Sequence, residues 1–252
     1  MVSLIQAIIL SIVQGITEWF PVSSSGHLAL LQHFFGFQNF SYDVFLHLAS
    51  VLALIVFFWS DIMSFFSFKR EKIIYFFKIV IAMIPAVIVG ILFRDYFESL
   101  MDNMFMLGLC FIFSGAVIYL TKFTRERKSE VGMFDAFFIG IFQALALLPS
   151  VSRSGMTISS GLFRNIDRKE VAKFSFLLAI PALIGANLFE AKNIFSLDIS
   201  LSILVISFGL TFLTSLITIK YLMQIITHEK FYLFGWYNVV LGVLIVAWSF
   251  II

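Results

Sequence analysis

Charged residues are scarce in this sequence. Only 13% of its 252 residues are Asp, Glu, Lys or Arg, whereas 61% are hydrophobic. So few charges could not keep a soluble domain of this length in water, and apolar runs of roughly 20 residues, long enough to cross a bilayer, recur along the chain. Cysteine is nearly absent as well, and Cys110 alone excludes an intrachain disulfide. The composition therefore predicts an all-α polytopic membrane protein.

Proline is also rare, and two of the four prolines interrupt apolar segments. Six segments are predicted as transmembrane helices, at about residues 43–60, 74–94, 104–121, 174–191, 200–222 and 232–251. The segments 1–36 and 133–163 are instead broken at Pro21 and Pro149, with serines just after each break. Proline ends a helix, and lipid tolerates a broken backbone only where protein or a wet cavity surrounds it. We therefore predict six transmembrane helices and two re-entrant helical hairpins.

The two broken segments resemble each other at a constant offset of 129 residues. The matching pairs include Gln14 with Gln143, Ser23 with Ser152, Ser25 with Ser154, and Gly26 with Gly155. Each half would contain one hairpin and three spans, and because three is odd, the second half must be inverted relative to the first. Residues 1–252 are thus expected to form a single integral membrane domain. Its inverted repeats cover about 1–121 and 133–251, and their broken helices meet near the bilayer midplane.

Basic residues gather in the loops that this arrangement places on one side of the membrane. By the positive-inside rule this side is cytoplasmic, so both termini face outward. The basic residues are explained by orientation and by contact with anionic lipid headgroups, and no nucleic-acid partner is expected. The group consists of Lys69, Arg70, Lys72, Lys122, Arg125, Arg127, Lys128, Arg164, Arg168, Lys169, Lys173 and Lys230.

The first hairpin carries an unusual set of polar residues. Gln14 and Glu18 are four residues apart, so they share a face of the first half-helix. A charge at membrane depth costs on the order of 2.5–3.5 kcal/mol, so Glu18 is either functional or a structural partner of Arg153. After the break come Ser23, Ser24, Ser25, Gly26 and His27.

The second hairpin contributes Arg153, the only basic residue far from the loops. Its guanidinium matches phosphate or carboxylate in a bidentate manner, and a helix that restarts after a break offers free N–H groups to an anion. These features predict a phosphate-sized anion pocket. Glu18 would repel that anion, so we predict it as a general base or as a ligand of a divalent cation. The residues around Arg153 are Ser152, Ser154, Gly155 and Thr157.

His27 allows two interpretations. It lies one helical turn after Ser23 and Ser24, within reach to act as a nucleophile or a proton carrier. A single histidine in a membrane helix is as often a packed, hydrogen-bonded residue without a chemical role. Both interpretations stay open on the sequence alone.

The chain resembles the bacitracin-resistance family of undecaprenyl-diphosphate phosphatases over nearly its whole length. The resemblance rests on "QGITE" at 14–18 leading to "PVSSSGH" at 21–27, on "PSVSRSGMT" at 149–157, and on the stretch 168–181 that ends in "FSFLLAIP". It implies an enzyme that removes one phosphate from undecaprenyl, or another polyprenyl, diphosphate. This reaction recycles the lipid carrier for cell-wall glycan synthesis and confers bacitracin resistance.

The resemblance also implies roles for individual residues. Glu18, Ser24 and Arg153 would be essential, with a pocket that opens to the extracytoplasmic face and a divalent cation, Mg²⁺ or Ca²⁺, which Glu18 would hold. Two departures stand out, since Gln14 replaces a second glutamate found in many members and Ser150 replaces the usual glycine. The residues expected around the substrate are Gln14, Ser23, Ser25, Gly26, His27, Ser152, Ser154, Gly155 and Thr157.

A transporter or lipid flippase is the alternative function. Inverted repeats with broken helices around a midplane anion site are also transporter architecture, and such a protein would equally need Arg153 and Glu18. The hydroxyls, the acid and His27 around one anion site favour the enzyme, because a passive carrier needs no nucleophile. The expected partners are a polyprenyl diphosphate and the lipids of the plasma membrane, and a homodimer is left open.

Overall fold

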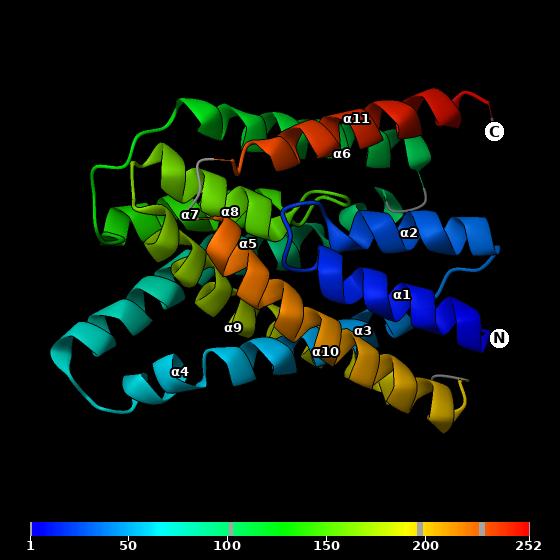
Figure 1. Ribbon diagram of the computed structural model, residues 1–252, viewed down its shortest axis with the longest axis horizontal. Helices are drawn as coiled ribbons and strands as arrows, with labels where there is room; N and C mark the ends of the chain where they lie inside the picture. The colour runs from blue at the N-terminus through cyan, green and yellow to red at the C-terminus, as the bar shows by residue number, and fades with distance from the viewer. Residues whose placement is uncertain (1, 101–102, 196–198, 227–229, 252) are drawn as a thin grey trace.

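A computed structural model describes residues 2–100, 103–195, 199–226 and 230–251, and no β-strand occurs in these ranges (Figure 1). The first half contains α1 (Leu4–Thr17), α2 (Ser24–Phe35), α3 (Phe40–Phe57), α4 (Trp59–Phe65), α5 (Arg70–Leu100) and α6 (Met104–Leu120), followed by the 3-10 turn η1 (Thr121–Phe123). The second half contains α7 (Met133–Leu145), α8 (Arg153–Phe163), α9 (Arg168–Phe195), α10 (Leu201–Ile225) and α11 (Leu233–Ser249). The predicted all-helical class is confirmed.

Five helical segments of the described chain are long and apolar enough to cross a membrane. They are Phe40–Phe57, Arg70–Phe93, Met104–Phe123, Arg168–Leu188 and Leu201–Ile225. The sixth predicted span, residues 232–251, is not among them, because α11 has only 17 residues. At 1.5 Å per residue that is about 26 Å, slightly less than a typical hydrocarbon core. The five long segments indicate a multi-pass membrane protein.

Both predicted interruptions are present. The first lies between α1 and α2 and contains Pro21, and the second lies between α7 and α8 and contains Pro149. The helix after each break starts from a serine N-cap: the hydroxyl oxygen of Ser23 accepts from the amide of Gly26 over 3.4 Å, and that of Ser152 accepts from the following Gly155 over 3.1 Å. A serine in this position satisfies a backbone N–H that would otherwise lack a partner. The serines therefore explain why each chain segment becomes helical again.

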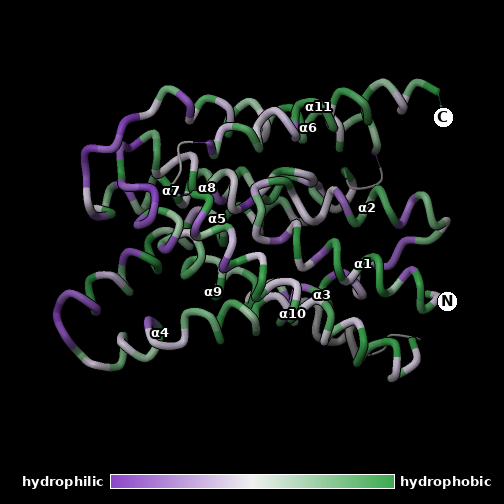
Figure 2. The backbone as a smooth tube through the Cα atoms, viewed as in Figure 1, coloured by the Kyte–Doolittle hydropathy of each residue, from purple (hydrophilic) through white to green (hydrophobic). Residues whose placement is uncertain are grey.

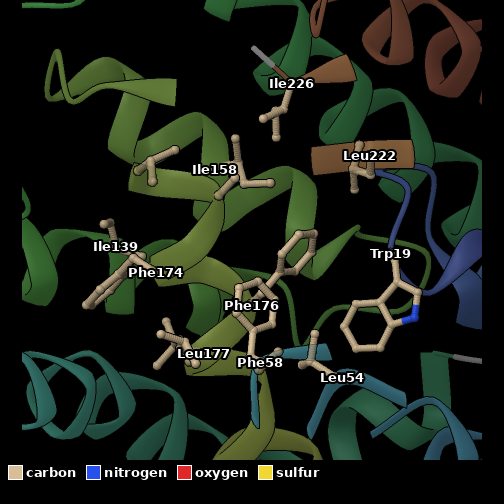
Figure 3. Close-up of a cluster of buried hydrophobic side chains, with 14 of the residues drawn as sticks. Trp19, Leu54, Phe58, Ile139, Ile158, Phe174, Phe176, Leu177, Leu222 and Ile226 are labelled. Carbon is tan, nitrogen blue, oxygen red and sulfur yellow. The ribbon is translucent and has the colours of Figure 1, made fainter. Parts of the chain in front are cut away.

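The pattern of helices repeats along the chain. Met133, Arg153 and Leu233 begin α7, α8 and α11, each 129 residues after the start of α1, α2 and α6. Helices from the two halves are interleaved, because α1 packs on α10, α7 on α5, α3 on α9 and α6 on α11. The main apolar core accordingly draws on both halves, as Trp19, Leu54, Phe176 and Leu222 illustrate (Figure 3). Neither half buries its apolar faces alone.

Hydrophilic segments gather at one end of the molecule (Figure 2). The α4–α5 connection and the segment after η1 lie at this end, and both chain ends lie at the opposite end (Figure 1). The segment after η1 is tied to the α8–α9 turn, where Arg168 pairs with Glu126 over 2.8 Å. Asp135 pairs there with Arg164 over 2.7 Å and with Lys128 over 3.1 Å. The basic loops predicted on one side thus lie together.

Glycines allow α6 and α11 to approach closely. A Cβ atom on Gly108 would lie 2.9 Å from the carbonyl oxygen of Gly242, and one on Gly115 would lie 2.7 Å from that of Gly235. Small residues at a crossing let backbones meet, which is a main source of helix association in lipid. The close packing of α6 on α11 therefore depends on these glycines.

We expect Gly115→Ala to lower the midpoint of thermal unfolding in detergent by several degrees. The new methyl group would lie 2.7 Å from the carbonyl oxygen of Gly235 and 2.7 Å from the amide nitrogen of Val239. These are backbone atoms, so they cannot rotate away as a side chain could. Gly209→Ala is the matched control, because a Cβ atom there has no heavy atom within 4 Å. Its gain of about 1 kcal/mol in helix propensity should leave the midpoint unchanged or higher. Equal midpoints for the two variants would contradict the close packing.

Candidate active site

The two helix breaks face each other. Arg153, the first residue of α8, donates from Nη2 to Oε1 of Glu18 over 2.7 Å. Ser154 donates from its hydroxyl to the carbonyl oxygen of Phe20 over 3.4 Å, and Asn238 of α11 donates to the carbonyl oxygen of Pro21 over 2.7 Å. Side chains of the second half therefore satisfy acceptors in the break of the first half.

Glu18 is the centre of this contact. It directly follows α1, and its side chain is only 4% exposed. While Oε1 accepts from Arg153, Oε2 accepts from Ser24 Oγ over 2.6 Å and from Gln14 Nε2 over 3.1 Å, and it lies 3.1 Å from Nε2 of His47. A buried carboxylate is tolerated only when it is paired and hydrogen-bonded, as here. We refer to Glu18, Gln14, Ser24, His47 and Arg153 as the Glu18 cluster.

Arg153 is supported by an aromatic ring and keeps donors free. Its Cζ atom lies 5.9 Å from the ring centroid of Trp19, which is itself fully buried and meets Phe176 edge-on at 5.7 Å. Among the described residues, the guanidinium nitrogens other than Nη2 have no hydrogen-bond acceptor. The arginine thus has a fixed plane and unused N–H groups, which suit an anion such as phosphate.

The three serines of the first break have different environments. Ser23 adopts a positive φ of 66° and caps α2, and its hydroxyl lies 3.3 Å from that of Ser25. Ser24 is the serine that contacts Glu18. The second break repeats this local arrangement, since the hydroxyls of Ser152 and Ser154 also lie 3.3 Å apart. Capping therefore accounts for one serine in each break, and Ser24 is available for another role.

Thr157 is directed away from the Glu18 cluster. Its hydroxyl donates to the carbonyl oxygen of Arg153 over 2.9 Å and lies 2.6 Å from the hydroxyl of Ser175 in α9. The side chain is 1% exposed. Although the resemblance implies that Thr157 lies around the substrate, its contacts in this structure join α8 to α9.

His27 also points elsewhere. Its Nδ1 lies 2.7 Å from the carbonyl oxygen of Ser23, and its Nε2 lies 2.6 Å from the hydroxyl of Tyr237 in α11. Because a carbonyl oxygen only accepts, Nδ1 carries the proton and Nε2 accepts from the tyrosine. Within the described part of the chain, no polar contact joins His27 to Glu18 or Ser24.

Ser150 explains one departure from the family pattern. It has a φ of 60°, in the left-handed region that glycine adopts without cost, and its buried hydroxyl has no partner among the described residues. A left-handed conformation costs an ordinary residue roughly 1–2 kcal/mol. The turn is therefore retained with serine, and the added side chain fills space against Gly26.

The sequence did not identify His47, Trp19 or Tyr237 as site residues. His47 lies inside the predicted span 43–60, and its signal was available: an ionisable side chain within a membrane helix is expensive and so marks a site. The aromatic residues gave no such signal in a chain with 17% aromatic residues. Their contacts depend on which helix faces meet.

The Glu18 cluster does not fit a divalent cation held by protein side chains alone. Such cations prefer several oxygen ligands, chiefly carboxylates. The described residues contain no group of three or more His, Cys, Asp or Glu side chains that could hold a metal ion. Both oxygens of Glu18 already accept hydrogen bonds or face basic side chains. The side chains of this cluster therefore do not form a cation site by themselves.

These features define a multi-pass helical membrane protein with a buried ion-pair cluster between two broken helical segments. The chain belongs to the family of bacitracin resistance protein BacA, whose sequence model matches residues 7–244. It is similar to proteins named undecaprenyl-diphosphatase. That of Halothermothrix orenii is 36% identical and that of Enterococcus faecalis 34%, with at least 96% of each chain covered. That of Methanosphaera stadtmanae is 34% identical over the full length of both chains. The resemblance found in the motifs is confirmed.

Proposed function

We propose that this protein is an undecaprenyl-diphosphatase, which hydrolyses undecaprenyl diphosphate to the monophosphate and inorganic phosphate. Full-length similarity to proteins of that name supports the activity. The observation that carries the proposal is the contact of an acid, a hydroxyl and a guanidinium in Glu18, Ser24 and Arg153. The reaction recycles the lipid carrier for cell-wall glycans in the plasma membrane and confers bacitracin resistance.

Arg153 and the two helix N-termini would bind the diphosphate. The free N–H groups of Arg153 suit the phosphate oxygens, and α2 and α8 begin at Ser24 and Arg153 with no acidic residue in their first turns. The positive ends of these helices are therefore available to the anion. Catalysis of phosphoryl transfer depends mainly on positioning and on charge stabilisation of this kind.

Ser24 is the nucleophile that we favour, with Glu18 as its base. The Ser24 hydroxyl already donates to Oε2 of Glu18. As its oxygen attacks the terminal phosphorus, the proton would pass to Glu18 and the phosphoanhydride bond would break. Glu18 would give this proton to the oxygen of the leaving prenyl monophosphate and so become a carboxylate again. It could then take a proton from water, whose oxygen attacks the phosphoserine, frees the phosphate and returns the proton to Ser24. Attack by water in the first step is the alternative, and His27 is less suited because its Nε2 accepts from Tyr237.

We propose the membrane arrangement that the sequence predicts. Six spans and two re-entrant hairpins in an inverted repeat are supported by the repeated helix starts and by the gathering of basic loops at one end. The termini and the pocket opening would then be extracytoplasmic, and the prenyl tail would lie between helices. A short α11 is compatible with a span if the bilayer thins slightly around it.

Hydrolysis itself is the first test. Purified protein in detergent should release one phosphate per undecaprenyl diphosphate, and Glu18→Gln should reduce the rate at least about 10²-fold, as expected for loss of a general base. A chelator, followed by added Mg²⁺ or Ca²⁺, tests the divalent cation that the family resemblance implies and that the side chains of the Glu18 cluster do not hold by themselves. Absence of phosphate release, together with movement of lipid phosphates across vesicles, would favour the transporter function instead.

Arg153→Lys should lower kcat/KM almost as severely as Arg153→Ala. Lysine keeps the charge but lacks the planar fork that binds two phosphate oxygens at once. Both variants should be measured beside Arg164→Lys, whose parent residue pairs with Asp135 at the hydrophilic end of the molecule. Near-normal turnover of Arg153→Lys would show that a point charge is sufficient and that the bidentate contact is unnecessary.

Single cysteines in a Cys110→Ser background should report the orientation. Ser67→Cys and Ser129→Cys lie at the end that carries the basic loops, and both positions are exposed. We expect them to be protected from an impermeant thiol reagent in intact cells and labelled after lysis. Gln38→Cys and Ser200→Cys should be labelled in intact cells. Labelling of Ser129→Cys before lysis would contradict the proposed orientation.

A further inference from the structure

We infer that His47 of α3 is a positioning residue for Glu18, which it holds through a charged N–H···O contact. Neither the motifs nor the similarity to known proteins draws attention to this residue. The inference rests on the proposed function, because it concerns Glu18 as the base that acts on Ser24. His47 enters the Glu18 cluster from a helix that is separate from both hairpins.

Nδ1 of His47 carries a proton. This nitrogen lies 2.7 Å from the carbonyl oxygen of Asp43, one turn earlier in α3. A carbonyl oxygen can only accept, so Nδ1 must carry a proton. This hydrogen bond also fixes the plane of the ring and directs Nε2 at Glu18, which it meets at 3.1 Å.

Glu18 is a carboxylate surrounded by hydrogen-bond donors. An amide nitrogen can only donate, so Oε2 accepts from Gln14, and it accepts a further hydrogen bond from Ser24. The other oxygen accepts from the guanidinium of Arg153. A carboxyl group surrounded by donors in this way is ionised.

The protonation of Nε2 in His47 follows from these two observations. A neutral His47 with its proton on Nδ1 would direct the lone pair of Nε2 at an ionised oxygen of Glu18, and two acceptors facing each other repel. Nε2 must therefore carry a proton too, so His47 is an imidazolium. The cluster then holds one negative and two positive charges, a net charge of +1, which suits an anionic ligand.

This arrangement has a consequence for turnover. Arg153 is paired with Glu18 in this structure, yet the same guanidinium is expected to bind the diphosphate. When Arg153 binds the phosphate groups of the substrate, the negative charge of Glu18 would lose much of its compensation unless a second cation stayed beside it. His47 fills this role from α3 and keeps the carboxylate oriented towards Ser24 while Arg153 serves the substrate.

The test compares His47→Ala, His47→Gln and a control, His33→Ala. His33 is exposed and meets the rings of Phe34 and Trp248, and no polar contact joins its side chain to the Glu18 cluster among the described residues, so its removal should change neither kcat nor KM. We expect His47→Ala to lower kcat about tenfold or more, with KM altered less than threefold, in protein whose thermal midpoint matches the control. His47→Gln retains an N–H donor without the charge and should recover part of the lost kcat.

A second arm tests whether His47 acts through Glu18. In Glu18→Asp, the carboxylate is withdrawn from His47 by one methylene group, so adding His47→Ala should lower kcat far less than it does in the wild type. A full additional loss would overturn the inference, as would a normal kcat in His47→Ala. Full activity of His47→Gln would overturn the imidazolium assignment. Failure of the wild type to release phosphate would instead reject the proposed function.

Discussion

The ion pair between Glu18 and Arg153 is the interaction on which the polar centre depends. It joins residues that are 135 positions apart and lies between two helix breaks. Removing one partner from a buried pair typically costs 3–5 kcal/mol, because the remaining charge is left uncompensated. The serine caps and the buried Trp19 beneath the guanidinium are therefore best understood as supports that bring two short polar segments into contact.

The same pair limits the chemistry that the site can perform. Glu18 accepts from a hydroxyl and lies beside two basic side chains, so it can take a proton from Ser24 only while its negative charge stays compensated. Arg153 in turn pairs with Glu18 in this structure and has to present N–H groups to a phosphate as well. Phosphatase chemistry in an apolar setting thus requires more positive charge than Arg153 alone supplies.

Local features of the sequence predicted much of this structure. Pro21 and Pro149 mark the two interruptions, and capping serines follow each, because both effects act over a few residues. The sequence also indicated that Glu18 and Arg153 could form an ion pair, since each charge would be costly alone in the membrane. The direction of His27, the involvement of His47 and the fixed position of Thr157 could not, because they depend on how α3, α9 and α11 are rotated against the hairpins. The predicted span 74–94 ends beside Phe93, whose φ of −123° and ψ of 17° are non-helical, and the helical residues of α5 after this kink were not predicted.

The interleaving of the two halves has a consequence for how the protein is made. α1 packs on α10 and α7 on α5, so the first hairpin reaches its final neighbours only after most of the chain has been synthesised. Until Arg153 leaves the ribosome, Glu18 has no guanidinium partner and would be expensive to keep ionised in lipid. In the nascent first half, His47 would therefore be the cation that compensates the carboxylate of Glu18. Assembly of the polar centre is then a late event of biogenesis, completed by the second half as it inserts.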